Sequence, residues 1–293
     1  MATVGGVFDP DKLDDLKERL RQAPGEEARK ELAATSEGPA PTRWSLRAIR
    51  ATFDWLHSYT LSGVWYLLRR CDYKLRPGRE QQYSPDPEYC QKVAYLVKIL
   101  QETAEYPDTR VLLFLDEMTY RRWPTVSATW SAMNEKAPEN VKAGNNQQQR
   151  LVGVLNALTG QVTYWQGYKV GRQQLIAFYQ QIVDTYPDKE CIYIPQDNWS
   201  VHKHPDVLNA VAQFPQIELV WLPTYAPWLN PIEKLWAWLK SDVLKMHRLA
   251  DQWDLLKQLV DQFLDQFASG SETLLERVGL KADGKLARAI CRA

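Results

Sequence analysis

Apolar residues recur along this chain at two spacings, which together predict an α/β protein preceded by a small helical unit. Helical spacing, with apolar side chains three or four positions apart, marks 9–34, 89–105, 173–186, 205–214, 231–243 and 255–267. Short apolar runs of strand length mark 111–115, 125–133, 150–158, 162–167, 191–194 and 218–222. The alternation of strands and helices after residue 109 is typical of a mixed sheet flanked by helices.

Two further short helices are predicted in 42–80. Trp44 and Ile49 lie in the first, and Thr60 or Ser62 provides an N-cap for the second. The short connection between them favours a helix-turn-helix arrangement. We therefore divide the chain into an N-terminal helix and linker (1–41), a helix-turn-helix-like unit (42–80), a linker and connecting helix (81–108), an α/β domain (109–270) and a C-terminal tail (271–293).

Basic residues are concentrated in the helical unit, although the chain as a whole has a net charge of zero. From residue 42 to residue 79 there are eight Arg or Lys and two Asp, which gives 8 − 2 = +6, whereas the first forty residues hold nine acids and six bases. Such a block favours phosphate binding, and the alternative is an Arg-rich surface that only faces water. The candidate phosphate contacts are Arg69, Arg70, Lys74, Arg76 and Arg79.

The composition excludes a membrane protein and a disulfide framework. The residues are 45% hydrophobic and 25% charged, as in an ordinary globular protein. The apolar run at 111–115 is far too short to cross a bilayer, and no secretory signal precedes it. The scattered cysteines indicate reduced thiols in a cytoplasm; they are Cys71, Cys90, Cys191 and Cys291.

Three acids stand at positions where predicted elements begin or end. Asp116 directly follows the strand at 111–115, Asp197 follows the strand at 191–194, and Glu233 lies in the first turn of a helix. Strand ends in open α/β sheets are where ligands bind. Carboxylates without a His or Cys cluster suit Mg²⁺, and two such ions can support in-line displacement at a phosphoryl group. The pattern therefore predicts two-metal phosphoryl transfer.

Each of these acids also has a purely structural interpretation. Asp116 is a possible turn former at a strand end, and Asp197 a possible Asx turn. Glu233 is a possible partner of Asn230 in a capping box. Glu117 is a further possible ligand, but adjacent residues of a strand face opposite ways, so we favour Asp116.

The sequence resembles DDE transposases, most closely the bacterial insertion-sequence branch related to mariner elements. The resemblance lies in the segments LLFLDEMTYRRWPT, YIPQDNWSVHKHPDV and LVWLPTYAPWLNPIEKLWAWLK around the three acids, and in GNNQQQRLVGVLNALTGQV at 144–162. The separation 233 − 197 = 36 is the short spacing of this branch. The similarity covers roughly residues 42–267, is specific around Glu233 and is weaker in the helical unit.

The resemblance implies a ribonuclease-H-like fold in which Asp116, Asp197 and Glu233 are catalytic ligands of two Mg²⁺ or Mn²⁺ ions. It implies cleavage at the ends of a mobile element, after which the freed 3′-hydroxyl attacks target DNA. The expected partners are double-stranded DNA, as terminal inverted repeats and as target, and a second copy of the chain that brings two ends together. The expected location is the bacterial cytoplasm, in association with the nucleoid.

Several other residues are expected to support this chemistry. Arg121, Arg122 and Lys234 are candidate phosphate contacts, each with an ordinary surface role as its alternative. His202 is a candidate DNA contact near the cut, or a histidine that only packs. Asn198 and Asn230 are candidate supporting residues, Asn198 by orienting a metal-bound water.

The chain departs from the family at its N-terminus. Family members usually carry two helical DNA-binding units, whereas the residues before Trp44 are few and acidic, so we expect the first unit to be absent or reduced. Two other functions therefore remain open. One is a catalytically silent DNA-binding remnant that represses transposition, and the other is a structure-selective nuclease of the same fold.

Overall fold

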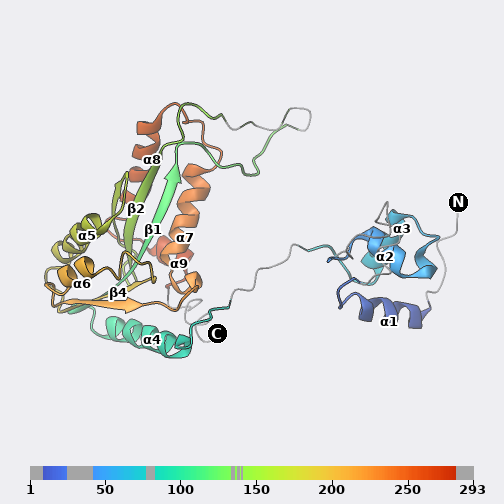
Figure 1. Cartoon of the computed structure of the whole chain (residues 1–293), viewed down its shortest axis with the longest axis horizontal. Coiled ribbons are helices and arrows are strands. Elements are labelled where there is room, and N and C mark those ends of the chain that lie inside the picture. The colour runs from blue at the N-terminus through green and yellow to red at the C-terminus, as the bar shows by residue number, and fades with distance from the viewer. Residues whose placement is uncertain are drawn as a thin grey trace. The chain divides into compact units, whose positions relative to one another are not determined.

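The computed structural model describes residues 9–24, 42–76, 83–132, 136, 139 and 141–281. The chain divides into two units, Met1–Glu80 and Gln81–Ala293, which are drawn in Figure 1. Each unit has a hydrophobic core of its own. Within the described ranges, no helix combines the length and apolar character needed to cross a bilayer.

The first unit consists of short capped helices around one small core. They are α1 (Pro10–Arg19), α2 (Leu46–Thr52), the 3₁₀ turn η2 (Asp54–Leu56) and α3 (Leu61–Arg70). Thr60, rather than Ser62, caps α3 by accepting a hydrogen bond from the Gly63 N–H. The helix expected at 9–34 ends at Arg19, and residues 25–34 lie outside the described residues.

The second unit is built on a mixed five-stranded sheet. Its strands are β1 (Arg110–Arg121), β2 (Gln148–Asn156), β3 (Val162–Gly167), β4 (Cys191–Gln196) and β5 (Ile217–Trp221), and their spatial order is β3-β2-β1-β4-β5. The strands β1, β2 and β3 pair antiparallel, whereas β4 and β5 run parallel to β1. This is the mixed sheet that the sequence predicted.

Helices cover both faces of the sheet, which explains the almost continuous apolar run in β1. Leu112 and Phe114 of β1 belong to one core, with α4 (Tyr89–Glu105), α7 (Ile232–Leu239), α8 (Trp253–Asp265) and α9 (Glu272–Val278). Leu113 and Leu115 belong to the other core, with α5 (Arg172–Thr185) and α6 (Pro205–Val211). Because side chains alternate along a strand, neighbouring residues of β1 serve opposite faces of the sheet.

The strand expected at 125–133 was a wrong prediction. In the described part of this segment, Thr125 makes a single bridge to Lys245, and β1 instead continues as far as Arg121. Pro124 has no N–H to give to a strand ladder, and Val126 is 84% exposed. The β-branched and aromatic residues in the described part of 125–133 therefore have no neighbouring strand to pack against.

Several other boundaries differ from the expectation, most of them by one or two residues. The helix expected at 231–243 is α7 followed by a π-helical turn, η4 (Lys240–Leu244), and the helix at 205–214 is shortened to α6. Helix α9 begins within the expected tail, and its Leu274 and Val278 join the core of the sheet. Helix α4 packs into the same core rather than linking two parts, because its stripe of Val93, Leu96 and Ile99 needs an apolar surface.

Candidate active site

The pairing of β1 with β4 brings Asp116 and Asp197 to one edge of the sheet. The last parallel pair is Leu112 with Tyr193, an offset of 193 − 112 = 81. The same offset puts Asp197 beside Asp116, since 197 − 116 = 81. Strand β4 ends at Gln196, so β1 runs on past it, and Asp116 lies within β1 rather than at its end. The interpretation of Asp116 as a strand-end turn former is therefore wrong.

Helix α7 carries Glu233 to the same edge. Asn230 donates from Nδ2 to the carbonyl oxygen of Leu115 at 2.9 Å, which ties the chain just before α7 to the residue that precedes Asp116. Ile232, Leu235, Trp236 and Leu239 are buried, whereas Glu233 is exposed. The first turn of α7 has no side-chain cap, so Glu233 is not the partner in a capping box.

All three acids line one pocket of about 380 Å³. The loop between β5 and α7 forms its rim, including the 3₁₀ turn η3 (Pro227–Leu229), and Asn198, Trp199 and Asn230 complete the lining. Asn198 donates to the carbonyl oxygen of Leu222 at 2.7 Å and so joins the end of β4 to this loop. The pocket thus gathers carboxylates that are far apart in the chain.

Burial and mutual repulsion perturb these carboxyls. Burial, together with the charges of Glu233 and Glu117, raises the pKa of Asp116 to about 8. Partial loss of water around its carboxyl in the pocket also raises the pKa of the otherwise exposed Glu233, although Lys240 opposes this. A bound divalent cation would remove the repulsion, and strongly perturbed acids in a pocket are typical of functional sites.

Trp236 holds one oxygen of Asp116. Its indole Nε1 donates to Asp116 Oδ2 at 3.0 Å. Gly153 is the β2 partner of Asp116, and a Cβ at Gly153 would lie 2.9 Å from the indole ring. The glycine therefore provides the space in which the indole reaches Asp116, and Trp236 is more than the core residue that its helical spacing indicates.

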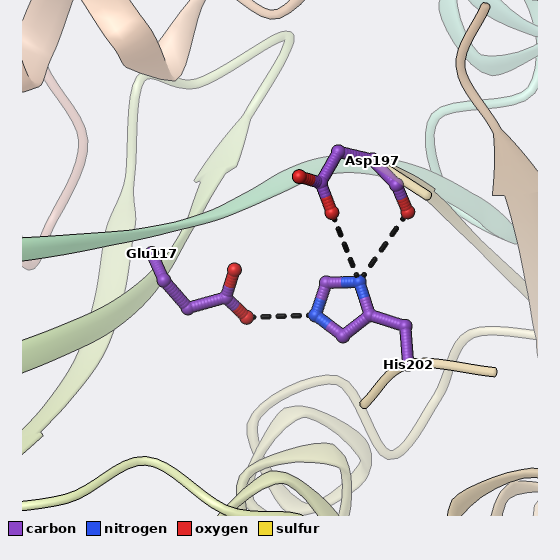
Figure 2. A group of neighbouring side chains, drawn as sticks. All are labelled: Glu117, Asp197 and His202. Atoms are coloured by element: carbon purple, nitrogen blue, oxygen red, sulfur yellow. Dashed lines mark hydrogen bonds and ion pairs between the residues drawn. The ribbon is translucent and has the colours of Figure 1, made fainter. Parts of the chain in front are cut away.

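His202 lies between two carboxylates on the opposite side of β1. Its Nε2 is 2.7 Å from Glu117 Oε1, and its Nδ1 is 3.3 Å from Asp197 Oδ1. Figure 2 shows the imidazole bridging the two acids, with Nδ1 also facing the Asp197 carbonyl oxygen. The separation between Glu117 and His202 in the sequence gave no signal of this contact.

The two carboxylates keep His202 charged. Burial lowers the pKa of His202, but its hydrogen bonds with Asp197 and Glu117 outweigh this effect and raise the pKa to about 10. Burial likewise raises the pKa of Asp197, while the hydrogen bond from His202 and one from the Trp199 N–H bring it below its ordinary value. The Trp199 contact is the Asx turn considered for Asp197, so turn and pocket coexist at this residue.

This arrangement bears on two of the expected site residues. The side chain of His202 is 0% exposed and lies between the two carboxylates, and its contact with DNA stays a prediction. Glu117, Asp197 and His202 bring ligand atoms within 4.8 Å of one another, so they form a further group of potential metal ligands that shares Asp197 with the acid pocket. Glu117 faces away from Asp116, as the strand geometry predicted.

The remaining candidate phosphate contacts have varied surroundings. Arg121 is exposed at the end of β1. Arg122 donates to the carbonyl oxygen of Ala250, and Lys234 donates to that of Val278, so both have structural contacts. In the first unit, the exposed candidates are Arg69, Arg70, Lys74 and Arg76, while Arg79 lies outside the described residues.

Comparison with known proteins places the second unit in context. Residues 111–256 match the model of the DDE superfamily endonuclease family. The insertion element IS630 uncharacterized 39 kDa protein of Shigella sonnei is 27% identical over 175 residues, which cover 59% of this chain and 50% of that protein. The chain thus spans about half the length of this curated relative.

Solved structures share the fold at low sequence identity. The Mos1 transposase paired-end complex with left transposon end has a TM-score of 0.59 and 15% identity, and the match covers 98% of this chain and 88% of that chain. A pre-cleavage Mos1 transpososome has a TM-score of 0.61 and 16% identity, with 89% and 82% covered. These matches confirm the predicted ribonuclease-H-like fold class, preceded by a small helical unit.

Proposed function

We propose that this chain, whose residues 111–256 match the model of the DDE superfamily endonuclease family, is a transposase that cleaves element ends and joins them to target DNA. The observation that carries the proposal is the single pocket that Asp116, Asp197 and Glu233 line together. We propose that these three carboxylates hold two Mg²⁺ or Mn²⁺ ions.

The chemistry of the donors fits hard divalent cations. The pocket lining offers carboxylate, amide and hydroxyl oxygens and has no Cys or His, as oxygen-seeking Mg²⁺ requires. Burial and the charges of Glu233 and Glu117 raise the pKa of Asp116, and a bound cation would favour the ionised form of this carboxyl. When bound, such ions would supply positive charge that stabilises an in-line displacement at phosphorus.

The residues of the chain prepare this site in three ways. Trp236 donates to Asp116 Oδ2 and so fixes the orientation of that carboxyl. His202 and the Trp199 N–H both hold Asp197 Oδ1. Asn230 anchors the start of α7 to β1 and so sets the position of Glu233. Preorganised ligands of this kind reduce the reorganisation needed when cation and DNA bind.

The relatives suggest the substrate. One is named as part of an insertion element, and structures of Mos1 transposase are described with a transposon end, with Mn and with Mg. We infer that the DNA partners of this chain are terminal inverted repeats and a target duplex. We infer also that two copies of the chain act together, since two ends must be cut and joined.

The test is a cleavage and joining assay with duplexes copied from inverted repeats that flank the gene. The parent chain is expected to cleave and join these ends only with Mg²⁺ or Mn²⁺. Asp116→Asn, Asp197→Asn and Glu233→Gln should each lose activity by at least about 10³-fold, while DNA binding stays near the parent level. Asp254→Asn, which changes an exposed acid on α8, is the matched control and should remain active.

The alternatives predict different results. A repressor remnant would bind the ends without cutting them under any metal condition. A structure-selective nuclease would cut branched DNA or RNA–DNA hybrids and join nothing. Full activity in any one of the three pocket variants would refute the assignment of the metal ligands.

A further inference from the structure

A second and larger pocket, of about 800 Å³, adjoins the acid pocket. We call it the basic groove. It is lined by Gln148 and Arg150 of β2, by the loop from Tyr168 to Arg172, and by Trp199, Ser200, Val201 and His204 after β4. Trp199 lines both pockets, so the two cavities adjoin at this side chain.

The charges around the basic groove are one-sided. Arg150, Lys169 and Arg172 line it, and no Asp or Glu does. Arg172 is paired with Asp206 at 2.6 Å. In the part of the chain that the structure describes, Arg150 and Lys169 have no carboxylate within ion-pair distance. The groove therefore carries about two positive charges that the protein leaves without a counter-charge.

From these features we infer that the basic groove binds the sugar–phosphate backbone of the DNA strand whose neighbouring phosphodiester lies in the acid pocket. This inference rests on the proposed function and adds to it the path of the strand. Arg150 and Lys169 contact successive phosphates, and Trp199 packs against a sugar or base where the strand passes from one pocket into the other.

DNA fits this groove better than a small anion does. A free phosphate would fill only a small part of 800 Å³. A strand instead supplies phosphates in series together with flat bases, which matches cations and a partly buried aromatic residue along a groove that adjoins a phosphoryl-transfer site.

The first experiment measures affinity for DNA in EDTA, where no cleavage occurs. Full-length protein is titrated into a fluorescein-labelled duplex of mixed sequence that has a single-stranded overhang, over a series of salt concentrations. Arg150→Gln/Lys169→Gln should weaken binding about fivefold for each lost phosphate contact near physiological salt, and should lower the salt slope by about 0.7 to 0.9 for each contact.

The control removes the same charge elsewhere. Lys98→Gln/Lys257→Gln changes cations on α4 and α8, which pair with Glu102 and Asp254, and should leave the affinity and the salt slope unchanged. The single variant Lys169→Gln changes an exposed residue. It therefore tests the groove even if loss of the half-buried Arg150 disturbs folding. The inference would be overturned if the groove variants and the control variant weakened DNA binding equally. It would also be overturned if inorganic phosphate competed with DNA equally well in the groove variants and in the control variant.

The second experiment locates the strand. Ser200→Cys places a thiol in the groove, and duplexes that carry a single thiol-modified phosphate are offered for disulfide formation, with the unmodified chain as background. Cross-links should be confined to a few phosphates on one side of the cleaved bond. A spread along the whole duplex would overturn the inference even if the parent cuts DNA normally, whereas confined cross-links without metal-dependent joining would count against the proposed function alone.

Discussion

At the scale of single residues, the most informative group is Asp116, because its pKa is raised to about 8 from an ordinary value of 3.8. Below about pH 4 this carboxyl is protonated in the folded and in the unfolded chain alike. Between about pH 4 and pH 8 only the unfolded chain releases the proton, so the stabilisation that Asp116 contributes is lost as the pH rises through this window.

We therefore expect Asp116→Asn to stabilise the metal-free protein relative to the parent, by up to about 1.4 kcal/mol for each pH unit within the window. Urea unfolding in EDTA between about pH 5 and pH 8 measures the difference. Asp254→Asn is the control, because Lys257 lowers the pKa of Asp254, and that variant should show no such gain. A constant difference between Asp116→Asn and parent across the pH range would contradict the raised pKa.

His202 gives a second prediction at this scale. Its removal in His202→Gln leaves Glu117, which is 14% exposed, without its cation, at a cost of about 3–5 kcal/mol of stability. Adding Glu117→Gln should recover most of that cost, because a neutral amide replaces the unpaired charge. Cleavage should nevertheless stay about 10- to 100-fold below the parent, because Asp197 has lost one of the two groups that hold its Oδ1. If the double variant recovered both stability and cleavage, the role of His202 would be purely structural.

At the scale of elements, the site depends on how α7 fits against β1 and β2. Gly153→Ala puts a Cβ 2.9 and 3.2 Å from two atoms of the Trp236 indole, and overpacking of this kind costs about 1–3 kcal/mol. Trp236→Phe removes those two atoms, so the double variant should be more stable than the sum of the single effects by about 0.5–3 kcal/mol. Thermal and urea unfolding of all four proteins measure this coupling.

The cleavage activity of the same four proteins separates the packing role of Trp236 from its role in positioning Asp116. Trp236→Phe loses the N–H that holds Asp116, so metal-dependent cleavage should fall by about tenfold or more even where stability is kept. Gly63→Ala in α3, where a Cβ meets only side-chain atoms at 3.3 Å or more, should lose neither property. Strictly additive stabilities would argue against direct contact between Gly153 and Trp236.

Sequence reasoning reached the elements that have a strong local pattern. The sheet class, most strands and all three pocket acids were predicted, because apolar runs and the segments around Asp116, Asp197 and Glu233 carry that information locally. The strand at 125–133 failed because its β-forming composition has no neighbouring strand to pair with. The contacts of His202 with Glu117 and of Trp236 with Asp116 span 85 and 120 positions, and no spacing rule connects residues so far apart.

At the scale of the whole molecule, the two units have separate cores. Leu16, Leu56 and Val64 belong to a core within Met1–Glu80, whereas the sheet cores lie within Gln81–Ala293. We expect fragments 1–80 and 81–293 to fold independently. Fragment 81–293 should bind Mn²⁺ as the full chain does but hold DNA more weakly, because the exposed Arg69, Arg70, Lys74 and Arg76 are absent from it.

Calorimetry measures independence directly. The unfolding curve of the full chain should equal the sum of the two fragment curves, and Mn²⁺ should shift only the transition of the larger fragment. One merged transition in the full chain, or failure of 81–293 to fold, would contradict this division of the chain.

The alternation of β1 has a consequence for how the chain tolerates change. Asp116 and Glu117 are consecutive, yet one faces the pocket and the other faces His202 behind the sheet. Deleting a single residue from 111–115 would exchange their directions. The pocket would then receive the carboxylate of Glu117, which lacks the contact that Trp236 makes with Asp116. The buried imidazolium of His202 would face the displaced Asp116. Evolution of this strand can therefore swap side chains far more readily than it can change its length.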